Sequence, residues 1–262
     1  MSKKIIAIIQ ARMGSTRLPG KVMKNIEGKP LLHYVVKQTL ASKFIDEVVV
    51  STSVSSEDNM IVNFCKKNRI NYYRGSKFDV LDRFYKSAKK FQCNPVIRIS
   101  ADSPLIDPNV IDRVFKKFLK NSYDYVSNNI EKSNQNWIDS SCRYPIGTVV
   151  EVATFNALET AWKKAKSSFE HEHVFPYIQS HPEIFKISNV MSKKNLSFIR
   201  ITVDKQNDLK FVKEIYKRIS KDKSAIKISD LEKILFNEPY LLKINEKINL
   251  NYDYQKSSLV KE

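Results

Sequence analysis

A short segment near the N-terminus carries the most concentrated chemistry in the chain. Residues 10–21 read QARMGSTRLPGK and come directly after the apolar run KKIIAII. Glycine lets the backbone turn sharply, small hydroxyls donate hydrogen bonds, and Arg and Lys neutralise phosphates. Residues of these types here are Arg12, Gly14, Ser15, Thr16, Arg17, Gly20 and Lys21. We interpret the segment as an anion-binding loop, in preference to a surface turn with incidental basic residues.

The spacing within this loop excludes two common phosphate-binding motifs. The segment does not fit G-x-x-x-x-G-K-[ST], and no G-x-G-x-x-G occurs in the chain. Neither a P-loop NTPase nor a dinucleotide-binding protein is therefore supported.

Two aspartates that follow other apolar runs are further candidates for chemistry. Asp102 comes just after PVIRIS, and Asp204 directly follows SFIRITV. An isolated carboxylate at such a position is either a helix N-cap or a metal ligand, and residue type alone leaves both open. Asp107 precedes Pro108, a pattern typical of an N-cap with Pro at the first helical position.

Strand-like runs alternate with amphipathic stretches through the first half of the chain. We expect strands at residues 5–10, 47–52, 70–74 and 95–100, and helices at 30–41, 57–68, 80–91 and 109–120. The continuous β-branched run EVVVST suits a strand that is covered on both faces. The alternation predicts an α/β fold with a Rossmann-like, mostly parallel sheet sandwiched by helices.

The pattern loosens after Tyr123. A strand is expected to end within residues 124–129, and a polar loop at 131–145 precedes strands at 147–153, 185–190 and 197–203. Helices are expected at 154–165, 169–180 and 208–220, and one more at 228–236 in a Lys-rich tail. We divide the chain into a domain of residues 1–221 and a C-terminal extension of residues 222–262.

The carboxyl ends of the strands are the expected place of the site, because ligands of open α/β sheets bind there. Four polar segments lie at such ends: the anion-binding loop, RGSKFDVLDR at 74–83, the end of VIRIS and the end of RITV.

Several blocks resemble the sugar-acid cytidylyltransferases. IIQARMGSTRLPGKVM and GKPLL are similar to that family's signature, above all to its spore-coat-polysaccharide-type branch, which is related to the CMP-Kdo and CMP-acylneuraminate synthetases. RGSKFDVLDRFYKSA, RISADSPLIDP, YPIGTVVEV, FEHEHVFPYI and SFIRITVDKQNDL follow in family order. The resemblance implies a nucleotide-diphospho-sugar transferase (GT-A-like) fold. It also implies a Mg²⁺-dependent transfer of CMP from CTP to an acidic sugar or related acceptor, with release of pyrophosphate, in cell-surface glycan biosynthesis such as that of lipopolysaccharide.

The resemblance also implies roles for residues on the nucleotide side. Asp102 and Asp204 match the two Mg²⁺ ligands of the family, and Arg12, Lys21 and Asp102 are expected to be catalytic. The expected nucleotide-binding residues are Ala11, Arg12, Gly14, Ser15, Arg17, Lys21, Arg83 and Ser100. Ser100-Ala101 stands where relatives often have Gln-Gly, and Arg17 either contacts the triphosphate or tethers the loop. For Arg74 and Arg98, a structural ion pair is an equal alternative to a ligand contact.

On the acceptor side, the resemblance points to Tyr144, Glu151, Glu172 and His173. The family segment usually reads P-x-G-x-D-V-E-V, so Val149 replaces an expected Asp while Glu151 is retained. A zinc site at EHEH is disfavoured, because residues two apart on a helix face away from each other and no third ligand has suitable spacing.

Composition limits the classes of function. The net charge of +17 comes mostly from scattered Lys residues, and without a nucleic-acid-binding motif we interpret it as solvated helix faces. No apolar run approaches the roughly 18 residues that cross a bilayer, so we expect a soluble, cytoplasmic protein. Cys65, Cys93 and Cys142 lack the spacing of a disulfide framework or a zinc site.

Two other functions stay open at this point. One is a glycosyltransferase of the same fold class that uses a nucleotide sugar, and the other is a nucleotide-binding subunit without catalysis. Val149 mildly favours the second, whereas the intact Asp102 and Asp204 argue against it. The acceptor itself is not named by any residue, and a homodimer is expected only because relatives are often dimers.

Overall fold

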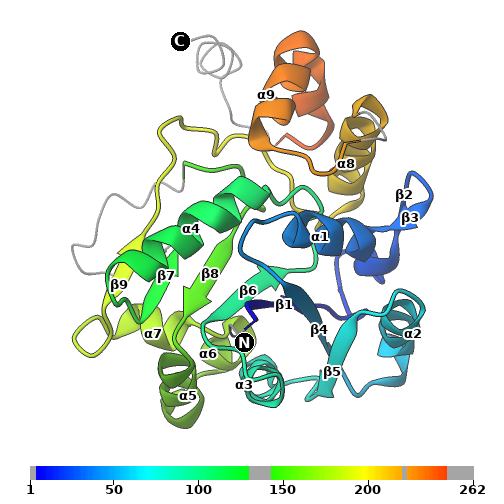
Figure 1. Ribbon diagram of the computed structural model, residues 1–262. Coiled ribbons are helices and arrows are strands. Elements are labelled where there is room, and N and C mark those ends of the chain that lie inside the picture. The colour runs from blue at the N-terminus through cyan, green and yellow to red at the C-terminus, as the bar shows by residue number, and fades with distance from the viewer. Residues whose placement is uncertain (1–3, 130–142, 220–222, 247–262) are drawn as a thin grey trace.

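The computed structural model describes residues 4–129, 143–219 and 223–246. In this part of the chain a sheet of seven strands has the order β5-β4-β1-β6-β8-β7-β9 (Figure 1). Its strands are β1 (Ile6–Gln10), β4 (Glu47–Ser53), β5 (Asn71–Gly75), β6 (Val96–Ser100), β7 (Tyr125–Ser127), β8 (Val150–Ala153) and β9 (Ile187–Asn189). Strands β5, β4, β1 and β6 are mutually parallel, and β8 runs antiparallel to both β6 and β7. The predicted α/β fold with a mostly parallel sheet is confirmed.

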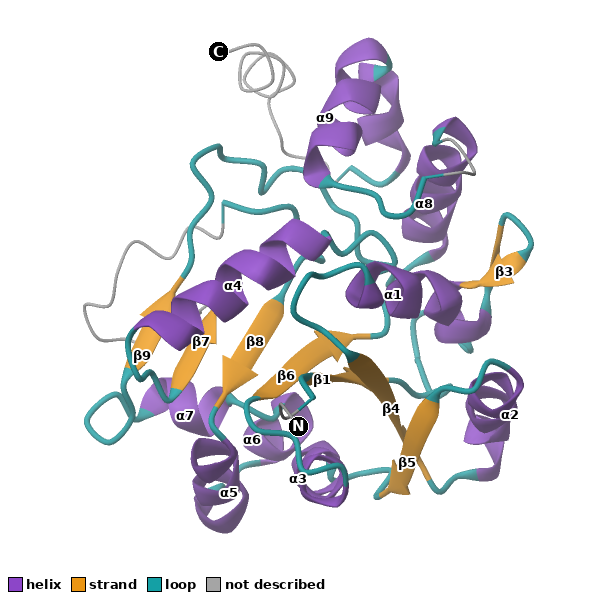
Figure 2. Cartoon of the chain, in the orientation of Figure 1, coloured by secondary structure: helices purple, strands orange, loops and turns teal. Residues whose placement is uncertain are grey.

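Helices cover both faces of the sheet, as Figure 2 shows. The α-helices are α1 (Leu31–Leu40), α2 (Asn59–Lys67), α3 (Val80–Lys90), α4 (Pro108–Lys120), α5 (Phe155–Lys164), α6 (Ser168–His173), α7 (Pro176–Ser180), α8 (Gln206–Arg218) and α9 (Ile228–Asn237). Short elements complete the description: η1 (Lys21–Met23), η2 (Ser56–Asp58), η3 (Pro239–Ile244), and the hairpin of β2 (Asn25–Ile26) with β3 (Lys29–Pro30).

Alternation along the central strand assigns its side chains to two cores. Ala7 and Ile9 of β1 belong to the core that contains side chains of α1, α2, α4, α8 and α9. Ile6 and Ile8 belong to the other core, which contains side chains of α3, α5 and α7. Successive side chains of a strand point to opposite faces, so a strand buried on both faces must be apolar along its buried length, as β1 is from Ile6 to Ile9.

Two expected elements are wrong. Residues 197–203 do not form a strand, and only Arg200 makes an isolated bridge, to Ile146. The segment exchanges hydrogen bonds with a turn at Ile146 and with the backbone of Asp102, so it lies across the strand ends instead of extending the sheet. The single helix expected at 169–180 is two helices, because Val174 has a φ of 75° and Pro176 opens a new first turn.

The described part of the C-terminal extension packs against the remainder of the chain. Leu231, Leu235, Leu241 and Leu242 are buried in the same core as α1 and α4. The side chain of Gln38 bonds both the N–H and the C=O of Ile226, at 2.8 and 2.7 Å. Asp107 is the N-cap of α4, as expected, and its second oxygen accepts from the N–H of Ile228 at 2.8 Å. The helix expected at 228–236 is present as α9.

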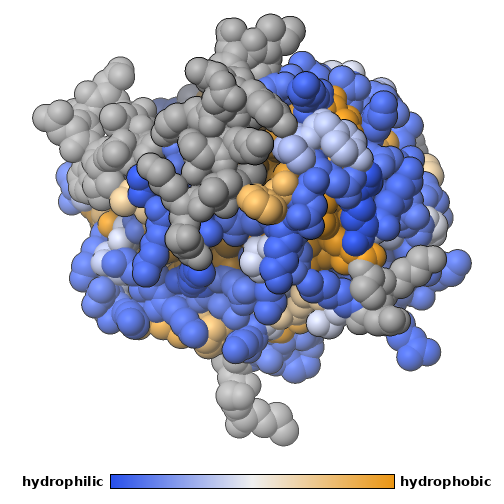
Figure 3. Space-filling model, turned by 90° about the horizontal axis from the view of Figure 1, so that it is seen from above, coloured by the Kyte–Doolittle hydropathy of each residue, from blue (hydrophilic) through white to orange (hydrophobic). Residues whose placement is uncertain are grey.

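The surface fits the interpretation of the charge as solvated side chains. Polar residues cover most of the face shown in Figure 3, with smaller apolar areas between them. No helix in the described ranges is long and apolar enough to span a membrane.

Gly147 allows the segment that ends in Asp204 to approach the turn before β8. Its φ is +106°, and a Cβ there would lie 2.5 Å from the backbone N of Thr202. We expect Gly147→Ala to lower the free energy of unfolding by about 1–3 kcal/mol from backbone strain, with a further cost from the clash. Urea unfolding would measure the change.

Gly28→Ala is the matched control for the clash. Gly28 has a φ of +87°, and no described heavy atom outside its chain neighbours lies within 4 Å of the position that a Cβ would occupy. This variant should therefore carry the backbone strain alone. Equal losses of stability in both variants would contradict the close-approach argument.

Candidate active site

The centre of the site is one ammonium group between two carboxylates. Lys21 Nζ lies 2.7 Å from Asp102 Oδ2 and 2.9 Å from Asp204 Oδ1. Lys21 belongs to η1 at the end of the anion-binding loop, and Asp102 follows β6. Asp204 reaches them because Val203 N donates to the backbone oxygen of Asp102 at 2.8 Å. Three segments distant in sequence therefore meet at this point.

Further cations surround Asp204. Arg17 lies 3.0 Å from its Oδ1 and Arg200 lies 2.7 Å from its Oδ2. Burial opposes ionisation of Asp204, but Lys21, Arg17 and Arg200 outweigh it and hold the pKa of this carboxyl below its ordinary value. Asp208 holds the Arg200 guanidinium in place, with its Oδ1 at 3.0 Å from Nε of Arg200. These three cations keep Asp204 ionised, and the ion pair with Arg17 links the anion-binding loop to it.

The two aspartates fit the demands of a magnesium ion. Each directs an oxygen at the same ammonium, so a cation at that place would be bound by both. Mg²⁺ is usually held in proteins by one or two carboxylates, with waters and substrate phosphates completing its shell. Among the described residues no group of three or more His, Cys, Asp or Glu side chains forms a closed metal site. Two carboxylates would leave most positions around a Mg²⁺ ion to waters and phosphate oxygens.

A buried aspartate that sequence reasoning missed holds the anion-binding loop. Asp58 accepts from Met13 N at 2.7 Å and from Thr52 Oγ1 at 3.0 Å. It also accepts from the N–H and the hydroxyl of Ser53, at 2.9 and 2.5 Å. The carboxylate joins the loop after β1 to the end of β4. The only local signal was an acidic residue beside a helix start, which does not distinguish such a tether from a cap.

Parts of the loop backbone are already bonded. Ala11 N donates to Ser51 O at 3.0 Å, and Ser15 N donates to Met13 O at 2.8 Å. Gly14 is exposed, and a Cβ there would lie 3.5 Å from Glu57 Oε1. Ser100 ends β6 beside Gln10, the residue before the loop. These four expected nucleotide-binding residues, Ala11, Gly14, Ser15 and Ser100, therefore lie at one edge of the sheet.

Arg83 is a cation buried with no carboxylate contact among the described residues. It has no exposed surface, its Nη1 donates to Ser76 O at 2.5 Å, and its Nε and Nη2 have no hydrogen-bond partner in that part of the chain. Burial and then the charge of Arg12 lower the pKa of Arg83 to about 10. Buried polar groups are nearly always bonded, so these two donors are available to acceptors of a ligand or to water. Arg74, by contrast, bonds Ser53 O and Ser55 O and is structural.

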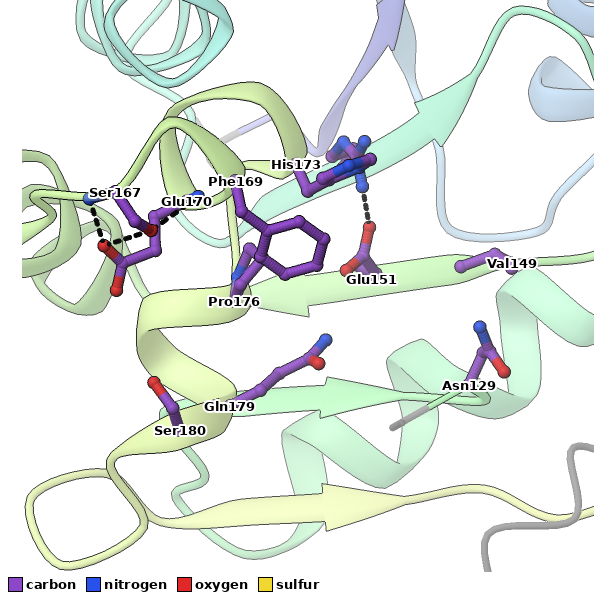
Figure 4. Close-up of a pocket in the computed structure, with 11 residues that line it drawn as sticks. Asn129, Val149, Glu151, Ser167, Phe169, Glu170, His173, Pro176, Gln179 and Ser180 are labelled. Carbon is purple, nitrogen blue, oxygen red and sulfur yellow. Dashed lines mark hydrogen bonds and ion pairs between the residues drawn. The ribbon is translucent and has the colours of Figure 1, made fainter. Parts of the chain in front are cut away.

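A cavity of about 450 Å³ lies between β8 and helices α6 and α7 (Figure 4). Its floor holds Arg98, which pairs with Glu151 Oε2 and bonds Gln10 Oε1 at 3.1 Å. Tyr125 donates to Glu151 Oε1 at 2.8 Å and accepts from Gln179 Nε2 at 2.7 Å. Burial, and then the Glu151 carboxylate, hold the pKa of Tyr125 well above its ordinary value. A continuous polar chain thus connects the anion-binding loop with the cavity.

Helix α6 contacts the loop and also lines the cavity. Glu172 lies 3.2 Å from Arg12, and His171 Nδ1 lies 3.0 Å from Asp79, the N-cap of α3. Phe169 and His173 line the cavity. A capping box formed by Ser167 and Glu170 defines the start of this short helix.

The four expected acceptor residues are not brought together. Glu151 and His173 line the 450 Å³ cavity, whereas Glu172 points to Arg12. Tyr144 lines a different cavity, of about 620 Å³, between the start of α4 and the start of α9.

The cysteines described by the structure lie in the cores. Cys65 and Cys93 are buried thiols, and burial raises the pKa of Cys65 to about 12. Cys142 lies outside the described residues.

Comparison with known proteins identifies the family. A family model described as cytidylyltransferase matches residues 6–255. The chain belongs to the cytidylyltransferase family. It is therefore a nucleotidyltransferase by family, and its fold is that of the nucleotide-diphospho-sugar transferases.

Relatives of this cytidylyltransferase cover nearly its whole length. An uncharacterized protein of Methanocaldococcus jannaschii is 37% identical over 94% of this chain and 96% of its own. The spore coat polysaccharide biosynthesis protein SpsF of Bacillus subtilis is 29% identical over 90% of this chain and 95% of its own. A cytidylyltransferase from Leptospira borgpetersenii superposes with a TM-score of 0.84 at 27% identity, over 95% of this chain and 100% of its own.

The contact between His171 and Asp79 makes a pH dependence of stability testable. The hydrogen bond to Asp79 raises the pKa of His171 above 6.5, against the opposing effect of burial. A raised folded-state pKa stabilises the fold fully below the unfolded value, and that stabilisation disappears as the pH rises through the folded value. We expect the Tm of the unmodified protein to be higher than that of His171→Gln. The difference in Tm should be largest at mildly acidic pH and should disappear in alkaline buffer. A difference that is constant with pH would contradict the ion pair.

Proposed function

We propose that the protein transfers CMP from CTP to a sugar-like acceptor carrying an acidic group, with release of pyrophosphate. The observation that carries the proposal is the pair of carboxylates, Asp102 and Asp204, which converge on Lys21 at the end of a loop rich in Arg, Gly and Ser. A glycan pathway is proposed from the relative in Bacillus subtilis, whose name refers to spore coat polysaccharide. Such a reaction would take place in the cytoplasm.

The residues that bind CTP would act by neutralising the negative charge of its phosphates. Mg²⁺ between Asp102 and Asp204 would take the place that the Lys21 ammonium holds there, and the three N–H donors of Lys21 could then bind phosphate oxygens. Arg12 is 40% exposed in its side chain, and its contact to Glu172 is a surface ion pair of the weak kind, so it can turn to the leaving pyrophosphate. Asp102 and Asp204 would hold Mg²⁺, which when bound supplies Lewis-acid stabilisation of phosphate charge.

Positioning would supply most of the remaining catalysis. An acceptor oxygen from the cavity attacks the α-phosphorus in line with the departing pyrophosphate, and the protein holds the two reactants in that geometry. The cavity lies beside the loop, because Arg98 on its floor bonds Gln10. Glycosyl transfer from a nucleotide sugar stays the second candidate in this fold class.

Arg83 would recognise the base. Cytosine presents two adjacent acceptors, O2 and N3, whereas uracil presents an N–H at the second position. The unused Nε and Nη2 of Arg83 are two adjacent donors, so they match cytosine and oppose uracil. This supports CTP as the donor in preference to UTP.

A pyrophosphate-release screen tests the proposal. The four nucleoside triphosphates are crossed with sugar acids, sugar phosphates and neutral sugars, with and without Mg²⁺. We expect release with CTP and Mg²⁺ for at least one sugar acid. Transfer from preformed nucleotide sugars without pyrophosphate would favour the glycosyltransferase instead.

Removal of one phosphate-binding charge should cost much of the rate. We expect Lys21→Ala or Arg12→Ala to lower kcat/KM by about 100-fold or more, because a preorganised donor contributes about 2.7–4 kcal/mol to the transition state. Steady-state kinetics would measure this, with Lys24→Ala as the control, since Lys24 is exposed on the same segment. Near-full turnover of Lys21→Ala would contradict its role.

Arg83→Met separates base recognition from stability. Replacing a buried unpaired cation by an apolar side chain of similar length should leave the free energy of unfolding unchanged or raised. Affinity for CTP should fall by about 10- to 100-fold, as for lost hydrogen bonds to a charged group, and the preference over UTP should narrow. Calorimetric titration and urea unfolding measure the two quantities. Lower stability with unchanged CTP affinity would show that Arg83 is structural.

A further inference from the structure

The described part of the C-terminal extension reaches the residues that hold Asp204. Asn245 follows η3, and its Nδ2 donates to Arg200 O at 3.0 Å and to Asp208 Oδ1 at 3.1 Å. An amide NH₂ group has two N–H donors, so these two contacts use both. The acceptors lie 45 and 37 residues earlier in the chain, so Asn245 joins the extension to the segment that contains Asp204.

Asp208 is the buried centre of these contacts. It is 3% exposed, and its Oδ1 also accepts from Arg200 Nε at 3.0 Å. Its Oδ2 accepts from the backbone N–H groups of Asp204 at 3.0 Å and of Lys205 at 2.9 Å. A carboxylate offers about four lone-pair positions, and these four donors can occupy them. Among the four, Asn245 is the one that comes from a distant part of the chain.

Asp208 acts on Asp204 in two ways. It holds the backbone N–H of Asp204 directly, and it holds the Arg200 guanidinium, whose Nη2 lies 2.7 Å from Asp204 Oδ2. The other oxygen of Asp204, Oδ1, is the one that lies against Lys21. The orientation of this carboxylate is therefore set by a frame of three side chains, those of Arg200, Asp208 and Asn245.

The attachment of the extension does not depend on Asn245 alone. Four leucines of the extension are buried in the core, and Arg218 of α8 pairs with Glu238 at 2.7 Å. The Asn245 side chain is polar and only partly buried, so it adds little apolar contact to this packing. Its two bonds bear instead on the position of the groups that they hold.

We propose that Asn245 is a positioning residue for the cation site. It acts through Asp208 and Arg200, which hold the carboxylate of Asp204 in place. Asp204 can then share a divalent cation with Asp102. The C-terminal extension thereby contributes to the site, although it lies outside the loops that follow the strands. The identity of the cation, Mg²⁺, rests on the proposed function, whereas the dependence of cation binding on Asn245 does not.

Binding of Mn²⁺ to the full chain tests the proposal without catalysis. Mn²⁺ prefers the same oxygen ligands as Mg²⁺, and water-proton relaxation distinguishes Mn²⁺ on the slowly tumbling protein from Mn²⁺ on free CTP. Titrations are made with and without CTP. Partners of metal ligands typically change metal affinity by about 10- to 100-fold when they are removed. We expect about 10-fold weaker Mn²⁺ binding for Asn245→Ala, at the lower end because the residue acts through others.

Two further variants separate the frame from general stability. Asn245→Asp keeps the side-chain shape but places a carboxylate against Asp208, so it should weaken Mn²⁺ binding more than Asn245→Ala does. Leu235→Ala is the matched control in the same extension, because Leu235 is fully buried and its truncation removes apolar packing alone. Its Tm should fall while its Mn²⁺ affinity stays within about twofold of that of the unmodified protein.

A double-mutant cycle tests whether Asn245 acts through Asp208. Asp208→Asn should weaken Mn²⁺ binding by about 10- to 100-fold. Contributions of residues in one hydrogen-bond network are not additive. Asn245→Ala should therefore cost less Mn²⁺ affinity in the Asp208→Asn background than in the unmodified protein. Equal costs in the two backgrounds would contradict the proposed path.

The outcomes of this experiment and of the pyrophosphate screen are separable. A lower Tm of Asn245→Ala with unchanged Mn²⁺ affinity would show that Asn245 only anchors the extension, and would overturn the proposal. Failure of the unmodified protein to bind Mn²⁺ in either titration would overturn it as well. Mn²⁺ binding that depends on Asn245 supports it even where no pyrophosphate is released from CTP, a result that would overturn only the proposed function.

Discussion

Two ionised carboxylates that lie close together in a half-buried site repel each other unless a cation lies between them. Lys21 meets that constraint for Asp102 and Asp204, which come from the end of β6 and from a segment about 100 residues further along the chain. Several other features serve this arrangement. The bond from Val203 to Asp102 brings the second carboxylate in, Gly147 lets that segment pass, and Asp58 holds the loop that leads to Lys21.

The site consists of two networks of polar side chains, and the short helix α6 contacts both. One system surrounds the aspartates and the basic loop, and the other runs from Gln10 through Arg98, Glu151 and Tyr125 to Gln179. Helix α6 contacts Arg12 with one side and lines the cavity with another. Its contact to Arg12 is a surface ion pair, which is weak and easily exchanged.

Arg83 is a residue that lowers the stability of the fold and that could serve ligand binding. A fully buried guanidinium with unused Nε and Nη2 donors is unfavourable for folding, and the charges of Asp58 and Asp79 offset only part of the cost of burial. A ligand that accepts hydrogen bonds from Nε and Nη2 would make its position next to Arg12 and Ser76 more favourable.

The sequence by itself determined the features that depend on neighbouring residues, namely the strands, the helices and a helix cap. Apolar runs and amphipathic stretches predicted most of the sheet and its covering helices, and the Asp-Pro pair predicted the cap at Asp107. Spacing also placed Lys21, Asp102 and Asp204 at segment ends. Tertiary structure alone decided the rest. Residues 197–203 have the apolar pattern of a strand but bond a turn and Asp102, and Glu172 belongs to the loop while His173 belongs to the cavity. These outcomes depend on which distant backbone groups and charges lie opposite, and no local pattern contains that information.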